Sequence, residues 1–201
     1  LRSSECQMPD HAVIADVSTT LESVLTNAFL MLGPQPPVAE VHDLSGLIST
    51  NPARLTLFLF EVVEDASMRN RGPLQSVTPP GLTLHKPPMP LLLRYLMTPW
   101  SGDRITDHRI LGRTLQTFHD DAIISGPSLL GGLANTNQAL KLMLAPMEID
   151  DRSRVWHAIQ RPYKLSLIYE VRVVNLDSTR TQTRSPISTR QLDSSAPAGS
   201  A

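Results

Sequence analysis

The stretch from Pro90 to Ile124 constrains the fold most, because its hydrophobic pattern changes period partway along. Residues 91–97 form a short apolar run with prolines on both sides, a pattern typical of a central strand covered on both faces. Pro99 and the sequence Ser101-Gly102-Asp103 then break the run. From residue 105 the apolar positions recur at three- and four-residue steps, which predicts an amphipathic helix with an inward face made of His108, Leu111, Leu115 and Phe118.

Other segments carry equally simple patterns. Residues 13–32 show a helical apolar stripe that ends at Gly33-Pro34. In residues 55–63 both alternating sets are apolar until Glu61, which predicts a second central strand. Residues 165–174 alternate cleanly, as a strand with one packed face does. Weaker signals predict an edge strand at 38–42, a half-exposed strand at 140–144 and a short helix at 148–160 that turns Val155, Trp156 and Ile159 inward.

These elements predict an α+β fold rather than a βαβ alternation. We expect a single domain over residues 13–177, with a mixed twisted sheet of about five strands and two long helices packed on one face of it. Residues 1–12 are predicted to be disordered, and residues 178–201 to form a flexible Ser/Thr/Pro-rich tail that buries too little apolar surface to order itself. The connection 64–90 is unusually long and predicts a functional or partner-binding arm, with a solvated loop as the alternative.

Composition narrows the classes of function. A net charge of −1 offers no electrostatic reason to bind nucleic acid or an acidic membrane surface, and an aromatic content of 4% argues against base stacking. The one cysteine, Cys6, excludes an internal disulfide framework and a multi-cysteine metal site. The sequence holds no 18-residue apolar run, so we expect no direct membrane span, and a soluble intracellular protein is the default expectation.

Patterns for phosphate and metal binding are incomplete. Residues 126–131 have the G-x-x-x-x-G spacing of a phosphate loop, but Gly132 and Leu133 stand where lysine and serine or threonine are needed. His108 and His119 are three helical turns apart, about 16 Å along the axis, which is too far for one ion. We interpret His108 instead as a hydrogen-bonded core histidine.

Patterns for hydrolysis are also weak. No G-x-S-x-G sequence is present, and Cys6 lies in an end predicted to be mobile. Glu61 and Glu64 at a strand end are typical of surface residues rather than of a glycosidase pair. The sequence therefore predicts no catalytic, cofactor-binding or metal-binding site.

Four blocks of sequence, taken together, resemble one family. They are IADVSTTLESVL, LTLFLFEVVED with RNR shortly after it, PLLLRYLMTPW leading to HRILGRTLQTFHD, and LKLMLAPMEIDDRSRVWHAIQRPYKLSLIYEVRVV. Their order and spacing are similar to those of the cap, or tail-terminator, proteins of phage-tail-like extracellular contractile injection systems, of the virulence-cassette and antifeeding-prophage type. The likeness runs from about Val13 to Asp177.

The resemblance implies a structural cap that is not an enzyme and needs no cofactor. Such caps form a ring, expected to be a hexamer, that terminates the inner tube and contractile sheath at the end distal to the baseplate. The implied partners are further copies of the chain, the tube protein and the sheath protein. Assembly is expected in the cytoplasm, within a particle that is later released or anchored.

The arm at 65–90 and the tail after Asp177 are our candidates for contacts between copies or with the sheath. Both are long and polar, and strand addition would supply part of the contact. The candidate interface residues are Arg69, Asn70, Arg71, Arg180 and Arg184.

Three alternatives stay open at this point. A phage tail terminator or head-tail connector protein would have the same architecture. A small hydrolase with an unrecognised site predicts a deep pocket with convergent polar groups. An adaptor to a membrane would need a basic amphipathic helix, and the sequence shows none.

Overall fold

The structure is a computed structural model, and it describes residues 11–68, 74–78, 81–85, 88–176 and 181–184. The chain divides into two compact units, which are taken separately below. The main unit contains residues 1–70 and 88–177, and the second unit contains residues 71–87 and 178–201. The expectation of a single domain over residues 13–177 stays a prediction.

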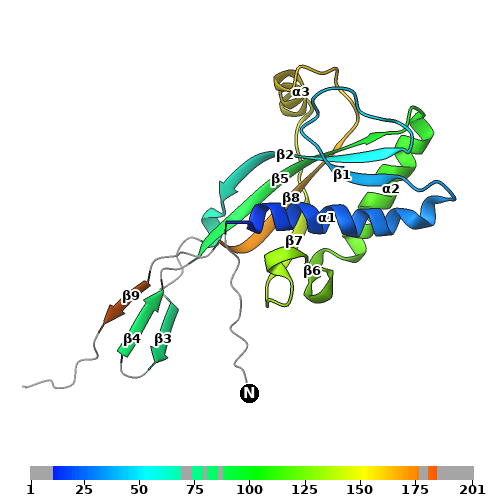
Figure 1. Cartoon of the computed structure of the whole chain (residues 1–201). Coiled ribbons are helices and arrows are strands. Elements are labelled where there is room, and N and C mark those ends of the chain that lie inside the picture. The colour runs from blue at the N-terminus through cyan, green and yellow to red at the C-terminus, as the bar shows by residue number, and fades with distance from the viewer. Residues whose placement is uncertain (1–10, 69–73, 79–80, 86–87, 177–180, 185–201) are drawn as a thin grey trace, which may run out of the picture. The chain divides into compact units, whose positions relative to one another are not determined.

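The main unit is built on a six-stranded mixed sheet with the order β1-β2-β5-β8-β7-β6 (Figure 1). Strand β1 runs parallel to β2, and every other neighbouring pair in this sheet is antiparallel. Strands β1 and β6 form the two edges. The strands are β1 (Val38–Val41), β2 (Arg54–Glu64), β5 (Met89–Trp100), β6 (Ile123–Ser125), β7 (Ala139–Leu144) and β8 (Leu167–Leu176).

Strand β5 is longer than the apolar run at residues 91–97. It includes Pro90 and Pro99, the two prolines that were expected to lie outside the strand. Pro90 stands where the register between β5 and β8 shifts, so the ladder does not need an N–H group there. Pro99 lies beyond Met97, the last β5 residue paired with β8, and pairs only with Leu55 of β2. Both prolines thus occupy places where one side of the strand has no regular partner.

Three α-helices complete the main unit. They are α1 (Val13–Phe29), which continues into a 3-10 turn η1 (Leu30–Leu32), α2 (Arg104–Asp120) and α3 (Ile149–Ala158). Asp103 caps the N-terminus of α2, and its carboxylate accepts hydrogen bonds from the backbone N–H and the hydroxyl of Thr106 at 2.8 and 2.7 Å. The chain leaves η1 at Gly33, which has φ +139. The expected helices are thus confirmed.

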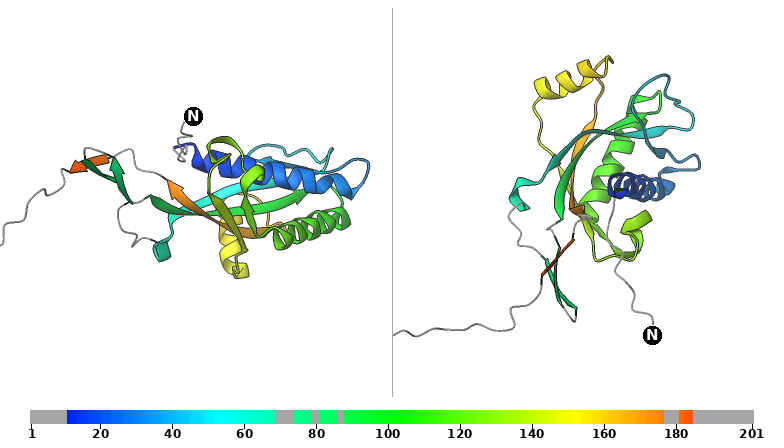
Figure 2. Two further views of the ribbon diagram at one scale, coloured as in Figure 1. Left: turned by 90° about the horizontal axis from the view of Figure 1, so that it is seen from below. Right: turned by 60° about the vertical axis from the view of Figure 1, so that its left-hand side comes forward.

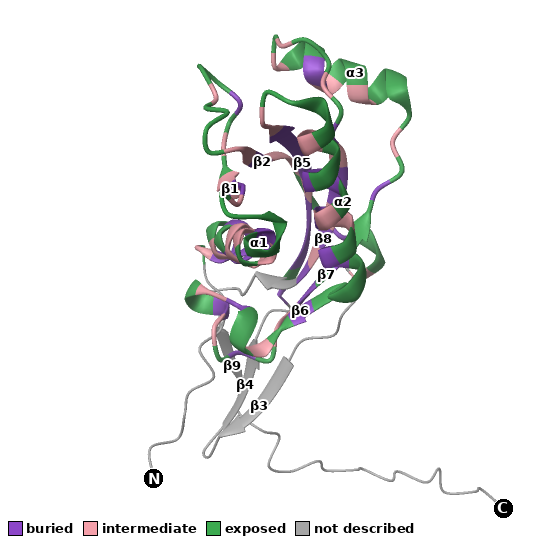
Figure 3. Cartoon of the chain, turned by 90° about the vertical axis from the view of Figure 1, so that its right-hand side faces the viewer, coloured by how far each residue is buried: buried purple, intermediate pink, exposed green. Residues whose placement is uncertain are grey.

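Strand alternation divides the apolar side chains of the sheet between two cores. On one face, Leu93, Tyr95 and Met97 of β5 join the buried side chains of α1 and α2 in the larger core. On the other face, Leu96 and Ile168 pack with Trp156 of α3 in a smaller core. Figure 2 shows α1 and α2 on the same side of the sheet, and Figure 3 shows buried residues concentrated where these elements meet the strands. The prediction of two long helices on one face is confirmed.

The segment after α2 has regular structure. It forms the short edge strand β6 and two 3-10 turns, η3 (Gly126–Ser128) and η4 (Gly131–Leu133). The carboxylate of Asp16 in the first turn of α1 accepts a hydrogen bond from the N–H of Gly132 at 2.9 Å. The glycines that mimic a phosphate loop therefore serve as a docking point for α1.

The second unit is a small antiparallel sheet with the order β3-β4-β9. Its strands are β3 (Leu74–Thr78), β4 (Gly81–His85) and β9 (Thr181–Arg184). The sequence predicts no strand here, because β9 lies about a hundred residues beyond β4 along the chain and its pairing leaves no local pattern. Six strands in the main sheet and three here, among the described residues, exceed the expected five.

Candidate interface surfaces

The five candidate interface residues belong to the segments around the small sheet β3-β4-β9. Arg69, Asn70, Arg71 and Arg180 lie outside the described residues. Arg184 is the last residue of β9 and pairs with Leu82 of β4. Their role stays a prediction. The described residues add three features that periodicity does not reveal: a charged cluster, an exposed apolar corner and an apolar groove.

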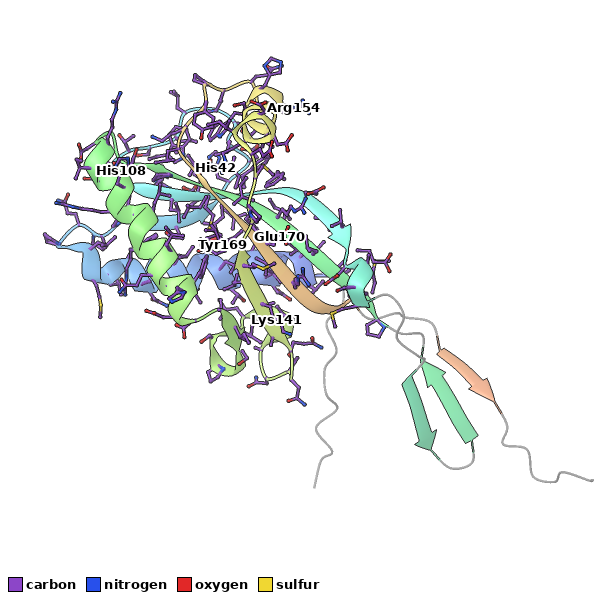
Figure 4. The ribbon with its side chains drawn as sticks, turned by 180° about the vertical axis from the view of Figure 1, so that it is seen from behind. His42, His108, Lys141, Arg154, Tyr169 and Glu170 are labelled. Atoms are coloured by element: carbon purple, nitrogen blue, oxygen red, sulfur yellow. The ribbon has the colours of Figure 1, made fainter. Side chains whose placement is uncertain are left out.

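The charged cluster lies across β2, β5 and β8 and consists of Glu61, Asp65, Arg94, Glu170 and Arg172. Arg94 of β5 bridges two neighbouring strands, with Nη1 2.6 Å from Glu61 Oε2 and Nε 2.9 Å from Glu170 Oε1. Arg172 Nη1 lies 3.6 Å from Asp65 Oδ2. Figure 4 shows Glu170 on β8 from this side of the sheet.

The pKa values of two members of this cluster, Arg94 and Asp65, are shifted in the direction that favours the charged form. Burial opposes the charge of Arg94, but its hydrogen bonds to Glu170 and Glu61 outweigh burial and raise its pKa. The Ser67 hydroxyl donates to Asp65 at 2.6 Å and lowers the pKa of Asp65, although burial acts the other way. The backbone N–H of Ser67 and the charge of Arg172 add to the lowering.

The charged cluster stands close to where the chain leaves the main unit. The N–H of Asp65 donates to the carbonyl of Pro90 at 2.9 Å, which ties the end of β2 to the start of β5. Arg172 of β8 then joins Asp65 to the third strand. The end of β2 and the start of β5 are thus joined to each other, and Arg172 connects them to β8.

The α1 corner consists of Leu30, Met31 and Leu32, three consecutive apolar residues in η1. Their exposed fractions are 62%, 82% and 38%. The guanidinium group of Arg113 in α2 lies beside them: Nε donates to the carbonyl of Ala28 at 3.1 Å, and Nη2 lies 3.7 Å from Met31 Sδ. The α1 corner is therefore an apolar knob with a positive charge at its base.

The α3 groove lies on the other face of the sheet, between α3, β2 and the loop after β1. Its volume is about 430 Å³, and its lining consists of Asp43, Leu44, Ser45, Phe58, Phe60, Val155, Ala158 and Ile159. Leu44 is buried, whereas Phe58, Phe60, Val155 and Ile159 are only partly covered. Arg161 donates a hydrogen bond to the carbonyl of Gly46, so the end of α3 and the loop are joined. The α3 groove is thus formed in the single chain.

Two further grooves have apolar linings. One of about 690 Å³ lies between residues 144–148, Arg152 and residues 165–168, and one of about 410 Å³ lies where the end of α2 meets β7. Exposed Met143 and Leu144 border the second of these. The surface therefore carries several apolar patches of the kind that protein partners cover.

His108 contradicts the sequence prediction. It is exposed, and Figure 4 shows it near the N-terminal end of α2. The buried face of α2 consists of Ile110, Leu111, Thr114, Thr117 and Phe118, and at about 100° per residue His108 falls on the flank of the helix outside this face. His108 is therefore not a core histidine. It borders a cleft that Arg104, Tyr163 and Lys164 also line.

Within the described part of the chain, no three histidine, cysteine, aspartate or glutamate side chains lie close enough to hold a metal ion. In that same part, no helix has the length and apolar character needed to cross a bilayer.

Comparison with solved structures shows the same fold in two tail-end proteins. The sheath/tube terminator of an extracellular contractile injection system, PVC, in its extended state is 18% identical, with a TM-score of 0.65 over 96% of this chain and 67% of that chain. The tube-terminating cap of the anti-feeding prophage is 16% identical, with a TM-score of 0.57 over 90% of this chain and 59% of that chain. The chain thus spans roughly two thirds of the length of these proteins.

A search of curated proteins finds no match. A family model does match: the Pvc16 N-terminal domain matches residues 16–190, which include all elements from α1 to β9 apart from the first residues of the helix. The chain therefore belongs to the Pvc16 N-terminal domain family.

Proposed function

We propose that this chain is a structural cap that terminates the inner tube and contractile sheath of an injection system at the end distal to the baseplate. The observation that carries the proposal is the shared fold with a sheath/tube terminator over 96% of the chain, together with membership of the family. The cap acts by covering surfaces, and no bond is made or broken.

The physics of a growing polymer supports this role. The last ring of a tube or sheath presents unsatisfied subunit surfaces, including strand edges, to which further subunits add. A closed ring of matching symmetry covers all of them at once. Because the contacts of a ring act together, each of them can be weak. We propose a ring of six copies, bound to the tube protein and the sheath protein.

The arm and the tail are our candidates for the contacts with the sheath or with neighbouring copies. Arg69, Asn70 and Arg71 precede β3, Arg180 precedes β9, and Arg184 is the last residue of β9. Among the described residues, β3 and β9 each pair with β4 on one side only, which supports strand addition as the mode of contact. The assembled cap is then part of a particle built in the cytoplasm and later released or anchored.

The decisive experiment assembles tube and sheath proteins on baseplates with and without this chain, and measures particle length by electron microscopy. With the chain we expect uniform particles that carry a ring at the distal end. Without it we expect longer and more variable tubes. Equal length distributions in the two preparations would reject the proposed function.

The arm and tail are tested in the same assay. We expect Arg69→Ala with Arg71→Ala, and separately Arg180→Ala with Arg184→Ala, to lower the fraction of capped particles. Deleting residues 178–201 should lower it further, because β9 is also lost. The matched control is Arg104→Ala with Arg109→Ala, which removes two exposed charges from α2. If the deletion caps as well as the control does, the tail has no part in the contact.

A further inference from the structure

Two apolar features of the main unit lie on different elements and differ in shape. The α1 corner is a projecting knob of three exposed side chains at the end of α1. The α3 groove is a hollow of about 430 Å³ between α3 and β2. Leu57 of β2 belongs to the core under α1, whereas Phe58 belongs to the core under α3, so knob and groove are associated with opposite faces of the sheet.

The chemistry of the two features is complementary. Leucine and methionine side chains are flexible apolar groups, and a methionine sulfur makes favourable contacts with aromatic rings. The groove offers two such rings, Phe58 and Phe60, both partly exposed.

The charges at the two features are opposite. Half-buried Arg113 places its guanidinium group against Met31 at the base of the knob. Asp43 lies at the groove, and its side chain is 72% exposed. The pKa of Asp43 is lowered, chiefly by the Ser45 hydroxyl that donates to it, so its carboxylate is charged at neutral pH.

Symmetry explains why one chain would carry both. A ring made by rotating one kind of subunit needs a heterologous interface, in which one surface of a copy meets a different surface of the next. A knob and a groove on separate elements satisfy this requirement, whereas a single self-complementary patch gives a two-fold dimer.

We propose that the α1 corner of one copy enters the α3 groove of the next copy, with Arg113 of the first facing Asp43 of the second. The proposal rests on the proposed function, because it is the ring of the cap that needs such an interface. It assigns ring closure to the main unit and leaves the arm and the tail for other contacts.

Cysteine cross-linking tests the pairing directly. Cys6→Ser removes the only cysteine of the chain, and Met31→Cys and Ala158→Cys then place one thiol on the knob and one at the groove, both at exposed residues. In capped particles treated with a short bis-maleimide, chains with both cysteines should give a ladder of dimers, trimers and larger species. A mixture of the two single-cysteine chains should stop at dimers, and each single-cysteine chain alone should give none.

A charge exchange provides an independent test. Arg113→Glu alone and Asp43→Arg alone should each lower the fraction of cross-linked copies about tenfold, because like charges then face each other across the interface. The chain that carries both substitutions should recover the ladder. Such recovery also shows that the single variants did not fail merely by unfolding.

Three results would overturn the pairing. They are self-linking of Met31→Cys alone, linking of Ala158→Cys to the tube or sheath protein, and absence of a ladder in double-cysteine particles that are capped. Particle length is measured on the same preparations. Normal length without a ladder rejects the pairing alone, whereas lengths that do not depend on the wild-type chain reject the cap itself.

Discussion

At the scale of single residues, Gly131 and Asp16 meet at a contact that only glycine permits. Gly131 has φ +61, and a Cβ atom there would overlap the Asp16 carboxylate, which holds the N–H of Gly132. We expect Gly131→Ala to impose backbone strain and also to displace that carboxylate. Together these should lower the free energy of unfolding by about 2–4 kcal/mol, measured by urea denaturation.

Gly126 offers a matched control for this substitution. Its φ is +64, but no atom lies within 4 Å of the place a Cβ would take. Gly126→Ala should therefore cost only the backbone strain, about 1–2 kcal/mol. Equal losses in the two variants would show that the Asp16 contact contributes nothing.

Tyr95 links α1 to the sheet and makes stability depend on pH. Its ring is buried, its hydroxyl lies 2.8 Å from Ser18 Oγ, and burial raises its pKa to about 12 even though the hydrogen bond with Ser18 acts the other way. Since this pKa is higher in the folded than in the unfolded chain, the contribution to stability is complete below pH 10 and is lost as the pH rises through 12.

Tyr95→Phe removes this titration. We expect the loss of unfolding free energy between pH 10 and 12 to shrink by about 2 kcal/mol relative to the wild type. The part that remains should include Tyr169, whose pKa burial also raises. Unfolding free energies measured at several alkaline pH values check this, and parallel pH profiles for the two proteins would contradict it.

At the scale of elements, α3 depends on one side chain. The helix has ten residues, of which only Trp156 is buried, and a helix this short is marginal in water without tertiary packing. We expect Trp156→Ala to lower the unfolding free energy by about 3–5 kcal/mol and to increase hydrogen exchange throughout α3. The neighbouring exposed His157 is the control, and His157→Ala should change stability by less than about 0.5 kcal/mol. Similar effects of the two substitutions would refute this account of α3.

At the scale of the whole molecule, the proposed cap predicts a stoichiometry. A ring that matches a six-fold tube requires six copies at one end of each particle, whatever the particle length. Quantitative mass spectrometry of particles of two lengths should give the same number of cap chains per particle. A number that grows with length would place the chain along the sheath and would contradict the cap.

The helices and the central strands could be predicted from sequence because their burial is periodic. The stripe from Val13 ends at Gly33 as expected, and alternation in residues 167–173 separates the two faces of β8. Periodicity failed for His108, because its three-residue spacing from Leu111 places it on the flank of α2 and not on the buried face that Ile110, Leu111 and Thr114 form. A repeat of apolar positions identifies a face, but how far that face is covered depends on the other elements.

The sequence by itself therefore determined the main elements and their inward faces, since these follow from local spacing, and its likeness to tail terminators indicated the family. Only the tertiary structure decided which distant segments share a sheet, as β4 and β9 do. It also decided contacts between distant segments outside the sheets, such as the hydrogen bond between Asp16 and Gly132. It also decided which apolar side chains remain exposed at the α1 corner and around the α3 groove. Such features depend on contacts between segments that are far apart in the sequence, and the local spacing of residues does not determine those contacts.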